Sequence, residues 1–196
     1  MKEIIPRDSL YIPLVQQRWC CVPACISMVM HRHGIPLVSQ ELLGFYLGVV
    51  VPKEDVKLFW NVKTGRKPSS GWGTRMSEKR FNPNSMFRKL HVPLEMAFHP
   101  IGSFLDMRAY KKYLSTIEEQ EKDVLACFSW GALYNKPYRG GHVCVIDRVD
   151  IRRDEIRLID PEYDAPKWRT VSIEKLKMAM ESHGKKEGGF WEFIKI

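Results

Sequence analysis

Residues 15–34, VQQRWCCVPACISMVMHRHG, constrain the fold more than any other part of this 196-residue chain. Two glutamines precede two adjacent cysteines, and Pro23 opens an apolar run that keeps helical spacing up to Gly34. Proline is favoured where a helix begins, and glycine is favoured just after it ends. The pattern therefore predicts a buried helix that begins at Cys21 or one residue later.

A cysteine at the start of a helix is a candidate nucleophile. The thiolate is the reactive form, and the positive end of a helix dipole or a nearby imidazolium lowers the pKa of a thiol from about 8.5. Cys21 occupies such a position, so covalent catalysis is one interpretation. The other is structural, because cysteine is among the residues most often buried. The partners of the cysteine must decide between the two.

The composition is that of an ordinary globular protein. The chain is 44% hydrophobic and 28% charged, and its length suits one domain, 1–196, with a substantial core. No apolar run reaches the length of about 20 residues that a transmembrane helix needs. The first residues also lack the apolar region of a signal peptide. We therefore expect a cytoplasmic protein without a membrane span.

The cysteines argue against disulfides and against zinc. There are five of them, at Cys20, Cys21, Cys25, Cys127 and Cys144. The count is odd and three lie in one short segment, which is a poor basis for a disulfide framework. The three also lack the spacing of a structural zinc site. We expect free thiols, no metal and no cofactor.

The net charge of +8 is compatible with a polyanionic partner. The lysines and arginines are nevertheless spread along the chain, and they form neither a basic stripe nor a nucleic-acid-binding motif. We therefore expect no nucleic acid partner. An acidic peptide would suit the same charge balance.

The order of helical and strand patterns predicts an α+β fold. Ser39 is the expected cap of a second helix, Asn84 caps a short helix at 85–90, and Asp106 opens a helix at about 106–121. A last helix is expected at about 172–182. Strands are expected at about 92–98, 124–130, 142–149, 155–159 and 190–194. We predict a mostly antiparallel sheet with the N-terminal helix packed against it.

Residues of about 48–83 are predicted to form an irregular insertion. This stretch is rich in proline and contains a Gly-Trp-Gly turn at 71–73. Loops of this length without regular structure are often functional. We therefore expect the insertion to flank the site, with Trp60, Trp72 and Arg75 on the wall that faces the substrate.

Two later residues are candidate partners of the cysteine. His142 opens a predicted strand, and Gly141 before it leaves room for a substrate backbone. Asp160 ends the next predicted strand, where its carboxylate can accept a hydrogen bond from the imidazole and fix its tautomer. Each residue also has a purely structural interpretation. His142 could be a core histidine hydrogen-bonded to a backbone carbonyl group, and Asp160 could simply start a turn together with Pro161.

Taken together, these residues resemble papain-like cysteine peptidases, and most closely the bacteriocin-processing peptidase domains and their stand-alone relatives. That pattern has a glutamine, a Cys-Gly-Pro-Ala helix start, Gly-His before a strand and Asp-Pro after the next strand. The resemblance covers the first 34 residues and about 140–161. The matching positions are Gln16 or Gln17, Cys21-Val22-Pro23-Ala24, Gly141-His142 and Asp160-Pro161.

The resemblance implies a papain-like fold and a role for each matched residue. Cys21 would be the nucleophile, His142 the general base and acid, and Asp160 the group that orients His142. The side-chain amide of Gln16 or Gln17 and the backbone N–H of Cys21 would form the oxyanion hole. The implied reaction is cleavage of a peptide or amide bond, in a peptide or protein substrate, through an acyl-enzyme.

Two alternative functions use the same residues. An acyltransferase or transglutaminase-like enzyme would pass the acyl group to an amine instead of water. A catalytically inactive peptide-binding module would keep the scaffold alone, and Val22, which stands where the family has glycine, favours this alternative.

Overall fold

The computed structural model of the protein describes residues 6, 8–58, 65, 67–137, 140–165 and 167–196. The helices in these residues are α1 Cys21–Arg32, α2 Gln40–Tyr46, α3 Pro83–Leu90, α4 Met107–Gln120, α5 Trp130–Tyr134 and α6 Ile173–His183. The strands are β1 Leu94–Pro100, β2 Asp123–Ser129, β3 Gly141–Asp150, β4 Glu155–Ile159, β5 Trp168–Ser172 and β6 Gly189–Lys195.

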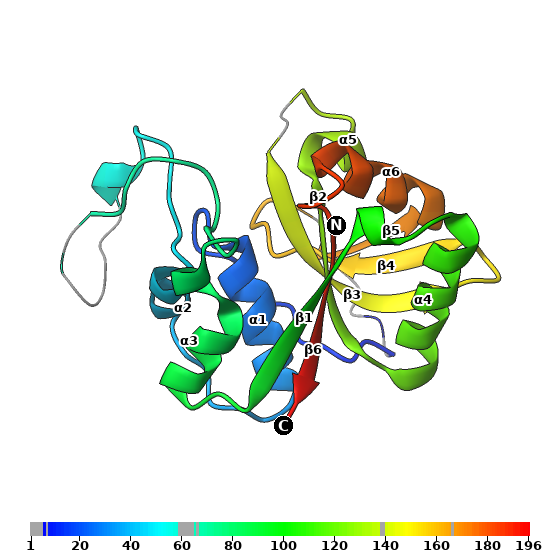
Figure 1. Ribbon diagram of the computed structural model, residues 1–196, viewed down its shortest axis with the longest axis horizontal. Coiled ribbons are helices and arrows are strands. Elements are labelled where there is room, and N and C mark those ends of the chain that lie inside the picture. Colours follow the sequence, from blue (N-terminus) through cyan, green and yellow to red (C-terminus); the bar gives the residue numbers. More distant parts are fainter. Residues whose placement is uncertain (1–5, 7, 59–64, 66, 138–139, 166) are drawn as a thin grey trace.

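The strands form one sheet in the order β1-β6-β2-β3-β4-β5. Every pair of neighbouring strands is antiparallel. Figure 1 shows α1, α2 and α3 to one side of the sheet and α4, α5 and α6 to the other. The predicted α+β fold, with an N-terminal helix on an antiparallel sheet, is confirmed.

Both faces of the sheet are covered, and this produces two hydrophobic cores. Leu125 of β2 belongs to the core under α1, whereas the next residue, Ala126, belongs to the core under α4 and α6. Successive side chains of a strand point to opposite faces. As a result β2 is buried at every position, and it reads in the sequence as one continuous apolar run.

Helix α1 begins at Cys21, as the sequence predicted, and is buried from Val22 to Met30. Pro23 is the third residue of the helix and not the first. The first turn still suits it, because N–H groups there have no intrahelical partner. Gly34 follows the helix in the left-handed region, with φ of +65°. The core packing of α1 fixes its first turn, and therefore Cys21, against the sheet.

The cap predicted for α3 was wrong by two residues. Asn82 caps this helix, and its side chain accepts hydrogen bonds from the backbone N–H groups of Asn84 and Ser85. Pro83 takes the first helical position, which proline favours. The side chain of Asn84 is engaged elsewhere, because it exchanges two hydrogen bonds with the backbone of Met96 in β1.

Two short elements were not predicted. Helix α5 follows β2 directly and spans a single turn, capped by the side chain of Ser129, where the sequence indicated the end of a strand and a loop. Strand β5 pairs only with β4 at the edge of the sheet, and none of its residues is fully buried. Neither element has the apolar periodicity on which the predictions rest.

The irregular segment before α3 is held together internally by two isolated β-bridges. Val50 forms a β-bridge with Gly73, and Val51 forms one with Ser70. Two 3-10 turns, Val56–Leu58 and Lys79–Phe81, lie in the same stretch.

Across the residues that the structure describes, no helix has the length and apolar character needed to cross a membrane.

Candidate active site

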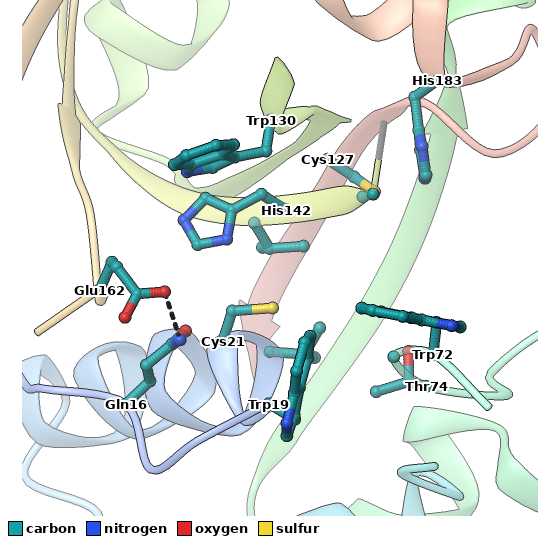
Figure 2. Close-up of a pocket in the computed structure, with 15 residues that line it drawn as sticks. Gln16, Trp19, Cys21, Trp72, Thr74, Cys127, Trp130, His142, Glu162 and His183 are labelled. Atoms are coloured by element: carbon teal, nitrogen blue, oxygen red, sulfur yellow. Dashed lines mark hydrogen bonds between the residues drawn. The ribbon is translucent and has the colours of Figure 1, made fainter. Parts of the chain in front are cut away.

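A pocket of about 740 Å³ lies where the start of α1 meets the start of β3 and the irregular segment. Cys21 and His142 both line it, and Figure 2 shows the His142 ring pointing toward Cys21. The wall is largely apolar and includes three tryptophans, Trp19, Trp72 and Trp130. The structure therefore brings together two of the residues singled out in the sequence, which are more than a hundred positions apart.

The turn before α1 places Cys21 at the edge of the pocket. The backbone N–H of Cys20 donates to the carbonyl oxygen of Gln17 at 2.8 Å, which closes the turn. Trp19 adopts a φ of +66° there, a conformation that is uncommon for a bulky side chain. Its indole N–H donates to the buried carboxylate of Asp55 at 2.7 Å. The irregular segment thus holds the turn that leads into the helix.

Burial separates Cys21 from the other thiols. Cys21 is partly exposed, whereas Cys20, Cys25, Cys127 and Cys144 are buried, and all are free. Burial raises the pKa of the Cys20 thiol to about 12, so that thiol stays protonated at neutral pH. Of the two adjacent cysteines, Cys21 is therefore the accessible candidate for the nucleophile.

His142 and Asp160 meet through the pairing of β3 and β4. Val145 lies opposite Ile159 in this antiparallel pair, so the residue that follows β4 comes close to the start of β3. The Nε2 atom of His142 lies 2.8 Å from Oδ1 of Asp160. Both side chains are buried, with 6% of His142 and 0% of Asp160 exposed. Since Nε2 is engaged by the carboxylate, Nδ1 is the atom left to face a thiol.

Asp160 is held on its second oxygen as well. The hydroxyl of Tyr134 donates to Oδ2 at 2.8 Å, and Nε of Arg169 lies 3.5 Å from the same atom. Burial by itself raises the pKa of Asp160, but hydrogen bonds from His142, Glu162 and Tyr134 and the charge of His142 lower it below its ordinary value. The carboxylate is therefore ionised at neutral pH.

The pKa of His142 is shifted in the opposite direction. Burial by itself lowers it, but the Cys144 thiol beside the ring and hydrogen bonding to Asp160, Cys144 and Cys21 raise it well above the ordinary value. A buried imidazolium needs a counter-charge, and Asp160 supplies one.

These shifts predict the titration of His142. We expect the imidazole to titrate at a higher pH than a free histidine, and ¹⁵N-resolved NMR of the ring should show this directly. The raised pKa of His142 also stabilises the folded protein. This contribution to the free energy of unfolding is complete below about pH 6.5, the pKa of an unfolded histidine, and is lost as the pH rises through the raised pKa of the folded state. A midpoint for His142 at or below that of a free histidine would contradict the assignment.

Three of these side chains also form a metal-like cluster. The polar atoms of His142, Cys144 and Asp160 lie within 4.8 Å of one another. Tetrahedral zinc keeps nitrogen and oxygen ligands about 3.3 Å apart, given metal–ligand distances of about 2.0–2.1 Å. The 2.8 Å between His142 Nε2 and Asp160 Oδ1 is shorter and is a hydrogen-bond distance. The chemistry of the cluster is therefore that of a hydrogen-bonded pair beside a packed thiol.

The two candidate glutamines differ in position. Gln16 lines the pocket, and its backbone N–H donates to the carbonyl oxygen of Pro161 at 2.8 Å. Gln17 is exposed and is not part of the pocket wall, and its backbone N–H donates to Oε1 of Gln40 at 2.7 Å. The structure therefore brings Gln16, and not Gln17, to the same pocket as Cys21.

The predicted substrate wall is only partly at the pocket. Trp72 lines it and meets Trp19 edge to face, with ring centroids 4.9 Å apart. Arg75 does not line it, because its guanidinium lies over the ring of Phe81, at 4.4 Å, and its Nε donates to the carbonyl oxygen of Gly48. Trp60 lies outside the described residues.

Gly141 lines the pocket for a different reason from the one expected. A Cβ atom at this position would lie 2.5 Å from Cε1 of His183, so the imidazole of α6 fills the space that a side chain would need. His183 and Glu162 are pocket residues that the sequence did not single out. Glu162 follows the Asp160-Pro161 pair and could have been noticed on that ground, whereas nothing near His183 in the sequence points to the site.

Comparison with known proteins identifies the fold of this chain through its structure and not through its sequence. No family model matches the sequence, and no curated protein matches it. The structure is similar to that of xylellain, a cysteine protease from Xylella fastidiosa, with 12% identity, a TM-score of 0.50 and coverage of 99% of this chain and 85% of that one. The fold is therefore that of papain-like peptidases, as the sequence predicted.

A second solved structure belongs to the same group of matches. It is the peptidase domain of Streptococcus ComA, a bi-functional ABC transporter involved in a quorum-sensing pathway. The identity is 14%, the coverage is 96% of this chain and 97% of that one, and the TM-score is 0.49.

Proposed function

We propose that the protein is a cysteine peptidase-like hydrolase that cleaves a peptide or amide bond through an acyl-enzyme on Cys21. One observation carries the proposal: the buried 2.8 Å hydrogen bond between His142 and Asp160 lies beside a thiol at the start of a helix, in one pocket. Xylellain, a cysteine protease, shares the fold and supports this choice of chemistry.

In the proposed acylation, His142 takes the proton of Cys21 through Nδ1, and the thiolate attacks the carbonyl carbon of the substrate. The C–S bond forms while the carbonyl π electrons move to oxygen. The side-chain amide of Gln16 and the backbone N–H of Cys21 donate to that oxyanion. The first N–H groups of a helix have no intrahelical partner, so the Cys21 N–H is available.

Acylation is completed when the oxyanion re-forms the carbonyl group, the C–N bond breaks and the amine leaves with a proton from His142. In the second half of the reaction, water attacks the thioester. His142 accepts the proton of that water, and the C–S bond breaks as the carboxylic acid forms. Asp160 keeps the ring in the tautomer that these transfers need, and its charge stabilises the imidazolium between them.

The apolar wall of the pocket indicates the substrate. The indole rings of Trp19, Trp72 and Trp130 line the same pocket as the thiol, and aromatic side chains provide large apolar contact areas. We therefore propose a peptide substrate with a bulky apolar residue near the cleaved bond. A fluorogenic peptide library sorted by side chain would reveal this preference.

The labelling of thiols tests the proposal. Iodoacetamide should label Cys21 first, but exposure alone predicts the same order, because the other four thiols are buried. The discriminating variant is His142→Gln, which removes the base, with circular dichroism as the check on folding. We expect Cys21 to be alkylated about 10²-fold more slowly at pH 6–7 in this variant, the lower end of the range for a general base.

Two controls make the labelling decisive. His183→Gln removes the second imidazole of the pocket and should leave the rate of Cys21 alkylation within a factor of two. Equal rates in the wild type and in His142→Gln would show that the thiol reacts without help from the imidazole, and the proposed function would then fail.

A further inference from the structure

The segment Asp160-Pro161-Glu162 contacts both sides of the candidate site. Asp160 binds the imidazole of His142. The carbonyl oxygen of Pro161 accepts the backbone N–H of Gln16 at 2.8 Å, and Oε2 of Glu162 accepts the side-chain N–H of Gln16, also at 2.8 Å. Figure 2 shows this last hydrogen bond, with Gln16 and Glu162 on the same side of the pocket. Three consecutive residues therefore hold two groups that come from distant parts of the chain.

The carboxylate of Glu162 is itself fixed in place. Its Oε1 accepts the backbone N–H of Tyr163 at 3.1 Å, and its own backbone N–H donates to Asp160 at 3.0 Å. The ammonium of Lys167 donates to its carbonyl oxygen, and the backbone N–H of Asp160 donates to the carbonyl oxygen of Lys167 at 2.9 Å. The loop therefore presents Glu162 to Gln16 in one defined position.

This contact decides which way the Gln16 amide faces. An amide group has an oxygen and a nitrogen of nearly equal size, and only hydrogen bonds distinguish its two orientations. The carboxylate of Glu162 only accepts, so the NH₂ group must face it. Oε1 of Gln16 is buried and has no hydrogen-bond partner in the described part of the chain. Because Oε1 makes no hydrogen bond there, only the hydrogen bond to Glu162 fixes the orientation of the Gln16 amide.

We propose that Glu162 is a positioning residue for the oxyanion hole, because it holds the Gln16 amide so that its second N–H is presented to the oxyanion. The NH₂ group has two hydrogens, and Glu162 engages one of them. The assignment rests on the proposed function, since it gives Glu162 a part in the same site. Glu162 itself does not touch the reacting atoms.

The consequence is specific to reactions that form an oxyanion. Without Glu162 the amide can rotate, and an inverted amide directs its oxygen at the developing negative charge. Loss of an oxyanion donor costs about 10²–10³-fold in rate. Loss of orientation removes the donor for only part of the time, so the effect should be smaller, at about 10-fold.

Two reactions of the Cys21 thiol distinguish a role of Glu162 in the oxyanion hole from a general loss of structure at the site. With p-nitrophenyl acetate, the C–S bond forms, the π electrons move to the carbonyl oxygen, and the C–O bond then breaks to release p-nitrophenolate. With iodoacetamide, sulfur displaces iodide and no oxyanion forms. The ratio of the acylation rate to the alkylation rate therefore reports on the oxyanion hole alone.

The variants extend this comparison. Glu162→Met is similar in length but cannot accept a hydrogen bond, and we expect it to lower the ratio about 10-fold. Glu162→Gln keeps an acceptor but adds a donor, so its ratio should fall less. Gln16→Ala should lower the ratio about 10²-fold, and adding Glu162→Met to it should change nothing more. Glu119→Met, on the exposed side of α4, is the matched control and should leave the ratio unchanged.

The possible results lead to different conclusions. An unchanged ratio in Glu162→Met, beside a lowered ratio in Gln16→Ala, would overturn the positioning role and keep the proposed function. Unchanged ratios in both would remove the oxyanion role of Gln16 and the positioning role with it. A wild type that is alkylated but not acylated would overturn both proposals. Equal falls of both rates in Glu162→Met would mean a purely structural role. If that variant does not fold, Glu162→Ala, which also removes the acceptor, takes its place, and an unchanged ratio there decides against the inference.

Discussion

Replacing Cys21 by alanine should abolish turnover and leave the fold intact. The side chain is partly exposed at the first position of α1 and is not part of the tightly packed interior of that helix. Removal of a catalytic nucleophile reduces kcat by about 10⁴–10⁶-fold, because no other group can form the covalent intermediate. Steady-state cleavage of a fluorogenic peptide library, with circular dichroism as the check on folding, measures both effects.

The matched control for this change is its neighbour. Cys20→Ala removes a thiol that is buried and protonated, so activity should stay within a few-fold of the wild type even if the protein loses some stability. If Cys20→Ala were inactive and Cys21→Ala active, the nucleophile would have been assigned to the wrong member of the pair.

Replacing Asp160 by asparagine should have the second largest effect. The amide can donate to His142 Nε2 and so select the wrong tautomer, and kcat should fall by about 10³–10⁴-fold. The pKa of His142 should also fall, because its buried counter-charge is gone. The pH–rate profile and the NMR titration of the ring are two separate measurements of this change.

Asp164→Asn is the control for this variant, because Asp164 lies in the same loop but is exposed. It should leave both the rate and the titration unchanged. Normal activity in Asp160→Asn, with the His142 titration unmoved, would mean that the 2.8 Å hydrogen bond has no part in the chemistry.

The parts of this structure that the sequence predicted well are those with strong local patterns. Pro23 and the apolar run after it located the start of α1 to within one residue. The strands that contain His142 and precede Asp160 are neighbours in the chain and form an antiparallel pair. The proximity of His142 and Asp160 could therefore be predicted from the order of these two strands in the sequence.

The parts that escaped prediction depend on contacts between distant segments. Glu162 forms a hydrogen bond with Gln16, which lies 146 positions away in the sequence, and no local sequence pattern predicts such a contact. His183 reaches the pocket only because α6 ends next to the start of β3. Arg75 was expected at the pocket, but its guanidinium packs on Phe81 inside the irregular segment. Elements of one turn, such as α5, are too short to show a helical period.

The most direct test of the central claim is to find the acyl group. After rapid acid quench of the protein with p-nitrophenyl acetate, peptide mapping by mass spectrometry should place the acetyl group on Cys21, and His142→Gln should abolish its rapid formation. Acetylation of another thiol at the same rate, or acetylation of Cys21 that is indifferent to His142, would contradict the account.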